Sequence, residues 1–131
     1  MVRPLPLEHF SYESNYACYR PVAEVDLTQA IDMVDRALRL CGEDNVAGLL
    51  VDIRQLTGFT QPSPTERYWF TKKWAETADG KVTLVMISRP ELMDPERIGV
   101  TMARNRGLIA DVFLDESDAV KWLLDELNKG K

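Results

Sequence analysis

The sequence is poor in the residues from which many catalytic and metal sites are built. Its 131 residues include one histidine, His9, and two cysteines, Cys18 and Cys41. A single histidine cannot form a histidine cluster for a metal ion, and its place near the N-terminus makes it a poor general base. The cysteines lack a C-x-x-C spacing, so we expect two small core residues and no disulfide framework.

Catalytic and cofactor-binding motifs are also missing. The chain contains no Walker loop and no G-x-G-x-x-G, H-E-x-x-H or G-x-S-x-G pattern. The sequence therefore predicts no metal and no cofactor, it identifies no catalytic residue, and it favours a protein that is not an enzyme. Missing motifs do not exclude an enzyme, but an enzymatic function would have to depend on Asp52 or Glu91 alone.

The chain also lacks the basic excess typical of nucleic-acid binding. Its 16 Lys and Arg residues stand against 21 Asp and Glu residues, for a formal net charge of −5, which argues against binding by phosphate neutralisation. The longest apolar run, residues 46–51, is far shorter than the roughly 20 residues of a membrane helix, and the N-terminus has no apolar signal region. We therefore expect a cytoplasmic protein with reduced thiols, no nucleic-acid partner and no membrane insertion.

The sequence does contain enough apolar material for one domain. Hydrophobic residues make up 45% of the chain and charged residues 28%, which suffices for an ordinary core. We expect a single domain over residues 1–131, frayed at 1–7 and 129–131. Near its start, segments 9–13 and 16–20 flank turn residues and predict a β-hairpin.

Two segments with strong capping signals predict the first two helices. The first carries apolar residues at helical spacing, has Asp26 as N-cap with Gln29 three residues later, and ends at Gly42. The second opens at residues 63–66 with a hydroxyl, a proline and a glutamate in capping-box order, and ends near Asp79.

The remaining elements complete an alternating pattern. A third helix is predicted to open with Asp94 as N-cap and Pro95 at the first helical position, and to close at Gly107, while Asp115 caps a fourth. Apolar runs at 46–53, 82–87 and 109–114 predict strands between the helices. The order β-β-α-β-α-β-α-β-α predicts an α/β fold: a mainly parallel five-stranded sheet, an antiparallel N-terminal edge strand and four helices.

This pattern resembles a known domain family. The run Leu-Leu-Val-Asp-Ile-Arg-Gln-Leu at 49–56, followed by a helix that opens at Ser63, resembles STAS domains, in particular the SpoIIAA-like branch. Further stretches are similar to small bacterial SpoIIAA-like proteins of no assigned activity: 57–59, 62–63, 67–70, 89–91, 94–95 and 105–108. The resemblance extends from about residue 16 to the end of the chain.

The resemblance implies a regulatory function. STAS domains serve as anti-sigma-factor antagonists, parts of anion transporters and signalling modules, regulated by phosphorylation at the start of the helix after the central strand. Asp52 lies where that pattern expects it, and Thr60 and Gln61 lie near the position of the usual Asp-Ser-Ser run, which this chain lacks, with Ser63 two or three residues beyond. We therefore expect a non-enzymatic protein-interaction module with an unidentified protein partner, or a homodimer. Its working surface would be the 54–63 loop with the start of the second helix, where phosphorylation would regulate it. The resemblance extends more weakly to the CRAL-TRIO lipid-transfer fold, which encloses an apolar ligand, but 131 residues is short for such a cavity.

An alternative function follows from the expected geometry of a parallel sheet. Ligands bind beyond the carboxyl ends of parallel strands, where this sequence places Asp52, Arg54, Arg89 and Glu91 together with the 57–63 loop. The amino ends of the second and third helices point to the same edge and favour an anion. The alternative is therefore a small-molecule protein that binds an anion or amphiphile. Equally, Ser63 can serve as an N-cap, and Asp52 as an ion-pair or backbone acceptor.

The aromatic residues of the second helix complete the candidates. Phe70 and Trp74 are four residues apart and suit the core, so Tyr68 or Trp69 must lie on a flank, at a subunit interface or a ligand wall. The candidate ligand- or partner-binding residues are Asp52, Arg54, Thr57, Thr60, Ser63, Arg67, Tyr68, Arg89 and Glu91.

Overall fold

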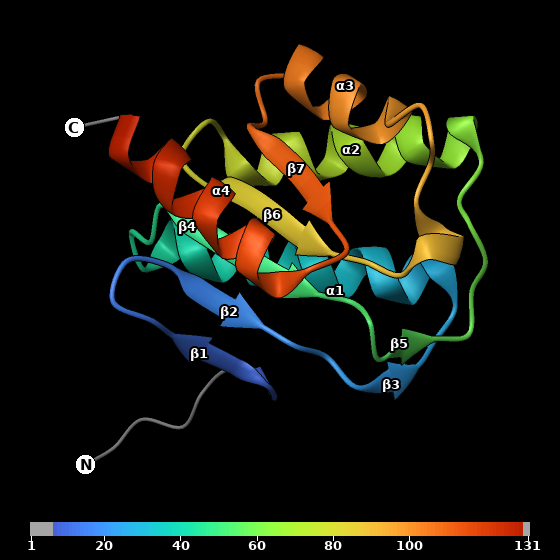
Figure 1. Ribbon diagram of the computed structural model, residues 1–131, viewed down its shortest axis with the longest axis horizontal. Coiled ribbons are helices and arrows are strands. Elements are labelled where there is room, and N and C mark those ends of the chain that lie inside the picture. Colours follow the sequence, from blue (N-terminus) through green and yellow to red (C-terminus); the bar gives the residue numbers. More distant parts are fainter. Residues whose placement is uncertain (1–6, 130–131) are drawn as a thin grey trace.

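A five-stranded mixed sheet forms the centre of the protein, and the computed structural model describes residues 7–129 around it (Figure 1). Its strands, in the order β1-β2-β4-β6-β7, are β1 (Phe10–Tyr12), β2 (Ala17–Tyr19), β4 (Gly48–Asp52), β6 (Thr83–Ile87) and β7 (Ala110–Phe113). Strands β1 and β2 form the expected antiparallel hairpin, and every other neighbouring pair is parallel. The predicted fold class is confirmed.

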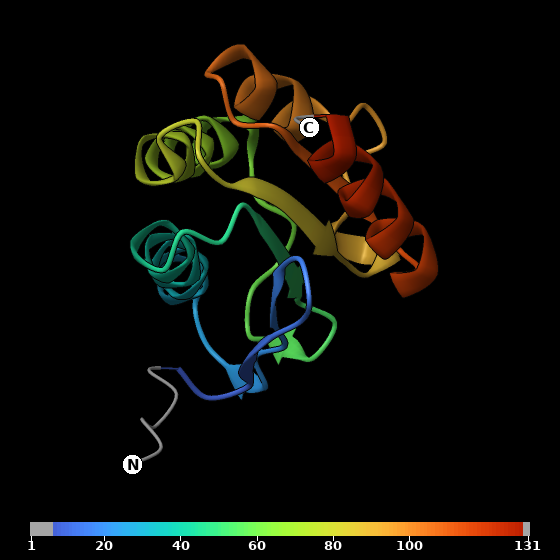
Figure 2. The same ribbon diagram turned by 90° about the vertical axis from the view of Figure 1, so that its left-hand side faces the viewer.

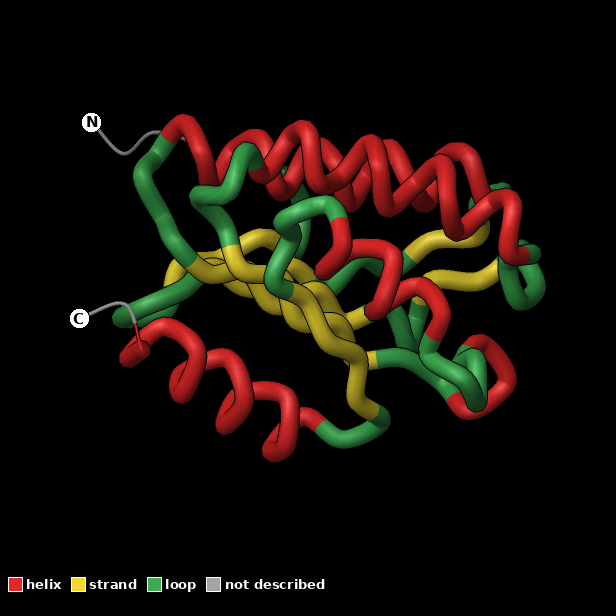
Figure 3. Tube along the Cα trace, turned by 90° about the horizontal axis from the view of Figure 1, so that it is seen from above, coloured by secondary structure: helices red, strands yellow, loops and turns green. Residues whose placement is uncertain are grey.

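Helices cover both faces of the sheet. Helices α1 (Leu27–Glu43), α2 (Pro64–Ala78) and α3 (Ile98–Asn105) lie on one face, and α4 (Glu116–Lys129) lies on the other (Figures 2 and 3). A short 3-10 turn, η1 (Pro90–Leu92), precedes α3. None of the helices in the described chain is long and apolar enough to cross a membrane.

The central strands alternate between two separate cores. Leu49, Val51 and Leu84 face the three-helix side, whereas Leu50 and Val85 face α4, and all five are at most 1% exposed. A strand buried on both faces needs apolar residues at every position, which explains the continuous apolar runs in the sequence. Cys41 and Cys18 are buried in the two cores and carry no disulfide, as expected.

Local capping signals fix three of the four helix starts. Asp26 and Ser63 each form a complete capping box, with side-chain to backbone distances of 2.8 Å to Gln29 N and 3.1 Å to Glu66 N. Asp115 accepts the backbone N–H of the third residue of α4 at 3.2 Å. These caps act within one turn of chain, which is why the sequence predicts them correctly.

Two predicted helix ends are wrong. Helix α1 continues through Gly42 to Glu43, and the left-handed residue that follows is Asn45, at φ 58°. Helix α3 begins at Ile98 instead of after Asp94, because Arg97 adopts φ 56° and interrupts the helical path. The Asp94 carboxylate nevertheless accepts the Ile98 N–H at 2.9 Å across this turn.

Arginines at both ends of α3 tie it to the outer strand of the sheet. Arg97 donates to the Val112 carbonyl at 2.7 Å, and Arg104 donates to the Ala110 carbonyl at 3.2 Å. Both also pair with the carboxylate of Asp111. Gly107, at φ 87°, ends the segment as predicted.

A second, two-stranded parallel sheet was not predicted. It joins β3 (Ala23–Glu24) to β5 (Leu56–Thr57), which are too short to show a period in the sequence. Next to it Gly58 has φ 105°, and a Cβ atom there would lie 2.3 Å from the Val25 carbonyl oxygen. Glycine is therefore required at the start of the loop that leads to α2.

The chain ends complete the description. The predicted frayed segments lie almost entirely outside the described residues. Leu7 packs against the three-helix core, and Lys129 is the last residue of α4.

Gly58→Ala should lower the free energy of unfolding by about 3 kcal/mol, because the new Cβ atom meets backbone and the residue must keep a positive φ. Gly42→Ala is the matched control, since it lies within α1 with open space around it, and it should stabilise by about 0.5–1 kcal/mol. Urea unfolding followed by circular dichroism measures both. Equal effects of the two substitutions would contradict this account of Gly58.

Candidate functional site

Asp52 lies at the carboxyl end of β4 in a network of ion pairs. Its carboxylate accepts two side-chain hydrogen bonds from Arg54, at 2.9 and 2.8 Å, and one from Arg20 at 2.9 Å. Glu116, at the start of α4, binds Arg20 at 2.6 Å and approaches Arg54 at 3.7 Å. The network joins β2, β4 and α4, and it neutralises two arginines with two carboxylates.

The protonation of Asp52 follows from these contacts. The side chain is 11% exposed, and burial alone raises the pKa of its carboxyl group. Hydrogen bonds from the Arg54 side chain and backbone, and from Arg20, outweigh burial, so the pKa of Asp52 lies below its usual value. The group is therefore a carboxylate at neutral pH, and it is a poor general base.

Arg89 is held by the backbone after β4. One guanidinium nitrogen donates to the carbonyls of Ile53, Arg54 and Leu56 at 3.1, 3.1 and 2.8 Å. A second nitrogen donates to Glu91 at 2.8 Å. An anion at this edge would have to compete with these acceptors for Arg89, and with Asp52 and Glu116 for Arg54.

The loop and helix starts at the same edge also have partners within the chain. Ser63 and Glu66 fill the amino end of α2, and Asp94 fills that of α3. Thr57 and Thr60 are exposed, and the Thr57 hydroxyl donates to the Ala23 carbonyl at 3.5 Å. The structure thus brings Asp52 together with Arg54, and separately Arg89 together with Glu91. The hydroxyl groups of the loop lie outside both networks.

The outer face of α2 carries two exposed aromatic residues. Tyr68 is 40% and Trp69 is 59% exposed, and their rings make an edge-to-face contact. The Arg106 guanidinium lies 4.5 Å above the Tyr68 ring, and Lys72 lies 5.4 Å from the Trp69 ring. Their exposure on a flank of α2 is as predicted.

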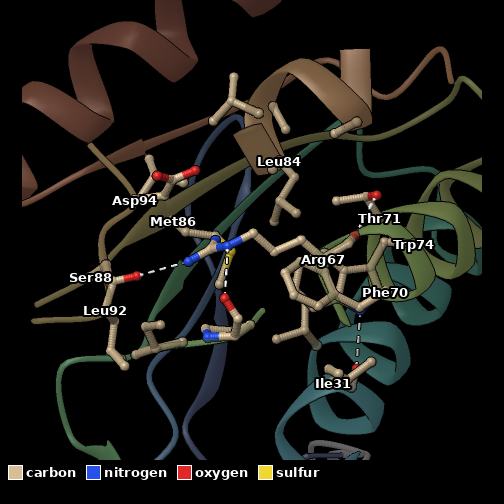
Figure 4. Close-up of a pocket in the computed structure, with 18 of the residues that line it drawn as sticks. Ile31, Arg67, Phe70, Thr71, Trp74, Leu84, Met86, Ser88, Leu92 and Asp94 are labelled. Atoms are coloured by element: carbon tan, nitrogen blue, oxygen red, sulfur yellow. Dashed lines mark hydrogen bonds between the residues drawn. The ribbon is translucent and has the colours of Figure 1, made fainter. Parts of the chain in front are cut away.

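An apolar cavity lies on the three-helix side of the sheet (Figure 4). Its volume is about 130 Å³, and α1, α2, α3, β6 and the segments after β4 and β6 contribute to its lining. Among the lining side chains are Ile31, Phe70, Trp74, Leu84, Met86 and Leu92. The sequence predicts that 131 residues are short for a cavity of the CRAL-TRIO kind, and the space found here is small and partly open to the surface.

Arg67 is the charged side chain that projects from α2 across this cavity (Figure 4). Its guanidinium donates to the carbonyls of Pro62 at 3.2 Å and Leu92 at 3.3 Å. Burial lowers the pKa of Arg67, and the charge of Asp94 only partly opposes this effect. Within residues 7–129 no carboxylate lies within ion-pair distance of Arg67.

The other polar groups of the lining, which are two hydroxyls and the side chains of Asp94, Arg97 and Asp111, have partners of their own. Thr71 donates to the Arg67 carbonyl at 2.7 Å, and Ser88, 5% exposed, reaches the Arg89 carbonyl at 3.5 Å. The lining contains no imidazole and no thiol. Across the described part of the chain, His, Cys, Asp and Glu side chains form no group of three that could hold a metal ion. The arrangement is suited to enclosing an apolar body beside a cation.

Comparison with known proteins identifies the fold. No protein-family profile and no curated protein matches the sequence. Among solved structures, the chain is similar to an uncharacterised protein of the DUF3478 family from Shewanella loihica PV-4, described as having a SpoIIAA-like fold. The TM-score is 0.51 at 16% identity, over 87% of this chain and 89% of that one. The protein therefore has a SpoIIAA-like α/β fold, as the sequence predicts.

Asp52→Asn should reduce the free energy of unfolding by about 1–2 kcal/mol at pH 7, because Arg20 and Arg54 lose their most buried partner. The folded pKa of Asp52 lies below its unfolded value of about 4, so its contribution is complete once the pH is well above that unfolded value and is lost as the pH falls through the folded pKa. The difference between wild type and variant should therefore shrink in acid. Denaturant unfolding between pH 3 and 7 measures it, with exposed Glu91→Gln as a control expected within about 0.5 kcal/mol of wild type. A difference that is constant with pH would contradict this assignment.

Proposed function

We propose that the protein is a binding module that holds a small, largely apolar molecule in the cavity between the three-helix layer and the sheet. The observation that carries the proposal is the cavity itself, which is comparable to the engineered space of about 150 Å³ known to bind benzene. Natural interiors are close-packed, and apolar side chains that line an unfilled space of this size lack both dispersion contacts and full apolar burial. A ligand would restore them.

The position of the cavity agrees with the general location of ligand sites in parallel sheets. Ile53 and Ser88, which directly follow β4 and β6, form part of its lining. The cavity therefore reaches the carboxyl edge of the sheet, where ligands of open α/β folds bind. Binding is favoured over catalysis because the two carboxylates of the lining are already engaged, Asp94 by two backbone N–H groups and Asp111 by two arginines.

Ala103→Leu in α3 should abolish binding of fluorobenzene, because the buried Ala103 side chain lines the cavity and the added carbons occupy it. Leu92→Ala should enlarge the space and admit bulkier probes such as fluoronaphthalene. Titration followed by ¹⁹F NMR measures binding, and thermal melts establish that the variants fold.

Leu114→Ala serves as the control, since this leucine is 47% exposed and lies outside the cavity. It should bind fluorobenzene like wild type. Failure of wild type to bind, or equal binding by Ala103→Leu, would overturn the proposal.

A protein-interaction role is the second candidate, and the exposed aromatic pair on α2 supports it. Exposed Tyr and Trp beside cations are typical of interface centres, and the pair is available to a second copy of the chain or to another protein. Exposed Thr57 and Thr60 are the candidate phosphorylation sites in this role, since Ser63 is engaged as an N-cap. Phosphopeptide mapping of residues 57–65 tests that regulation.

If the pair forms a homodimer interface, Trp69→Ser should convert the dimer to a monomer in sedimentation velocity at micromolar concentration, because it removes the most exposed ring of the pair. Lys121→Ser, an exposed residue of α4 on the opposite face of the sheet, is the control and should not change the sedimentation coefficient. A wild-type protein that sediments as a monomer would contradict the homodimer.

A further inference from the structure

We propose that the cavity selects small organic acids, with the carboxylate of the ligand bound by Arg67 and its apolar body enclosed by the helices. This inference rests on the proposed function and names the chemical class of its ligand. Three observations support it: the state of Arg67 in the protein, the composition of the lining, and the size of the space.

The first observation is that Arg67 has no ion-pair partner among the described residues. Among the described residues the other arginines fall into two groups. Arg20, Arg39, Arg54, Arg89, Arg97 and Arg104 pair with carboxylates, and Arg36 and Arg106 are exposed. Arg67 is partly buried, and its guanidinium donates to two neutral carbonyls at 3.2 and 3.3 Å. A desolvated cation without an anion is costly, so an anionic ligand group would bind with little competition from the protein.

The geometry of the guanidinium agrees with this role. Nε and Nη2 donate to the two carbonyls, and these contacts orient the plane of the guanidinium. Nη1 makes no hydrogen bond within the described chain. Nη1 lies beside Gly99 of α3, where a Cβ atom would be 3.5 Å away. The small residue leaves space at the nitrogen that remains able to donate. A planar guanidinium is well suited to a planar carboxylate.

The second observation concerns charge inside the cavity. Asp94, Arg97 and Asp111 also contribute to the lining, but each is engaged: Asp94 accepts two backbone N–H groups, and Arg97 pairs with Asp111. The Asp94 carboxylate keeps its negative charge and lies close enough to act on Arg67, but it forms no ion pair with it, so Arg67 is the cation of the lining that has no ion-pair partner among the described residues. A monoanion brings one negative charge to Arg67, whereas a phosphate monoester would bring a second one into an apolar space that already holds the Asp94 carboxylate.

The third observation is size. About 130 Å³ accommodates one aromatic ring or a short branched chain, and not a long acyl chain. Phe70 and Trp74, with ring centroids 4.6 Å apart, form one wall and suit contact with a flat apolar body. The ligand class is therefore a monocyclic or short branched carboxylic acid.

The experiment compares 4-fluorobenzoate with the neutral probe fluorobenzene by ¹⁹F NMR titration at pH 7, in wild type and in Arg67→Met. Met removes the charge and keeps an unbranched side chain that helices accept. We expect the dissociation constant of 4-fluorobenzoate to rise at least about tenfold in Arg67→Met, because charge-assisted hydrogen bonds are lost. Fluorobenzene should bind both proteins within about threefold. The control is Arg36→Met at an exposed position of α1. It makes the same change in net charge and should leave the affinities for 4-fluorobenzoate and fluorobenzene unchanged.

A second comparison needs no variant. 4-Fluorobenzamide has nearly the shape of 4-fluorobenzoate without its charge, and wild type should bind it at least about tenfold more weakly. If fluorobenzene binds while benzoate and benzamide bind equally, or while Arg67→Met leaves benzoate binding intact, the acid selectivity is overturned and the apolar binding function stands. If neither fluorobenzene nor 4-fluorobenzoate binds wild type, both proposals are overturned.

Discussion

The rest of the structure depends on one constraint: strands β4 and β6 are buried on both faces and must be covered on both. One helix, α4, covers one face, and Leu50 and Val85 pack against it. Three helices share the other face, and side chains from all three reach the strands without filling the space between them. The cavity is thus a product of the layering. Helices that meet over a twisted sheet leave a gap wherever their ridges do not interlock, and here the gap is lined by large apolar side chains together with Arg67.

Charged side chains are arranged in two different ways around the sheet. At the carboxyl edge, arginines and carboxylates pair among themselves, so Asp52, Arg54 and Arg89 stabilise the connections between strands and the elements that follow them. On the three-helix side, Arg67 has neutral acceptors only, as far as residues 7–129 show. Paired charges in a partly exposed network contribute modestly to stability, whereas an unpaired one in an apolar space favours whatever anion can reach it. Arg67 therefore differs from the arginines of the carboxyl edge in having no carboxylate within ion-pair distance among the described residues.

Sequence reasoning succeeds where the determinants are local. The capping boxes at Asp26 and Ser63 and the apolar strand runs act within a few residues, and they place the helix starts and the central strands correctly, whereas the order of the strands in the sheet is visible only in the structure. The start of α3 could not be predicted, because it depends on the left-handed conformation of Arg97, which is tied to β7 across the fold. The cavity depends on how three helices pack against the sheet, and no periodicity or motif in the sequence predicts it. Arg67 is a sequence candidate only through the family resemblance, and its placement inside an apolar space is visible only in three dimensions.

The arginines of α3 have a consequence for how the molecule behaves among copies of itself. Ile109, Asp111 and Phe113 direct their backbone groups toward β6 or its continuation, as the bonds to Leu84 and Ser88 show, so the carbonyls of Ala110 and Val112 face outward on the rim of the sheet. Arg104 and Arg97 occupy those two carbonyls. An incoming strand would find its acceptors taken and positive charge in its path, which is a natural protection against edge-to-edge aggregation. Self-association by strand addition is therefore disfavoured at the β7 edge of the sheet.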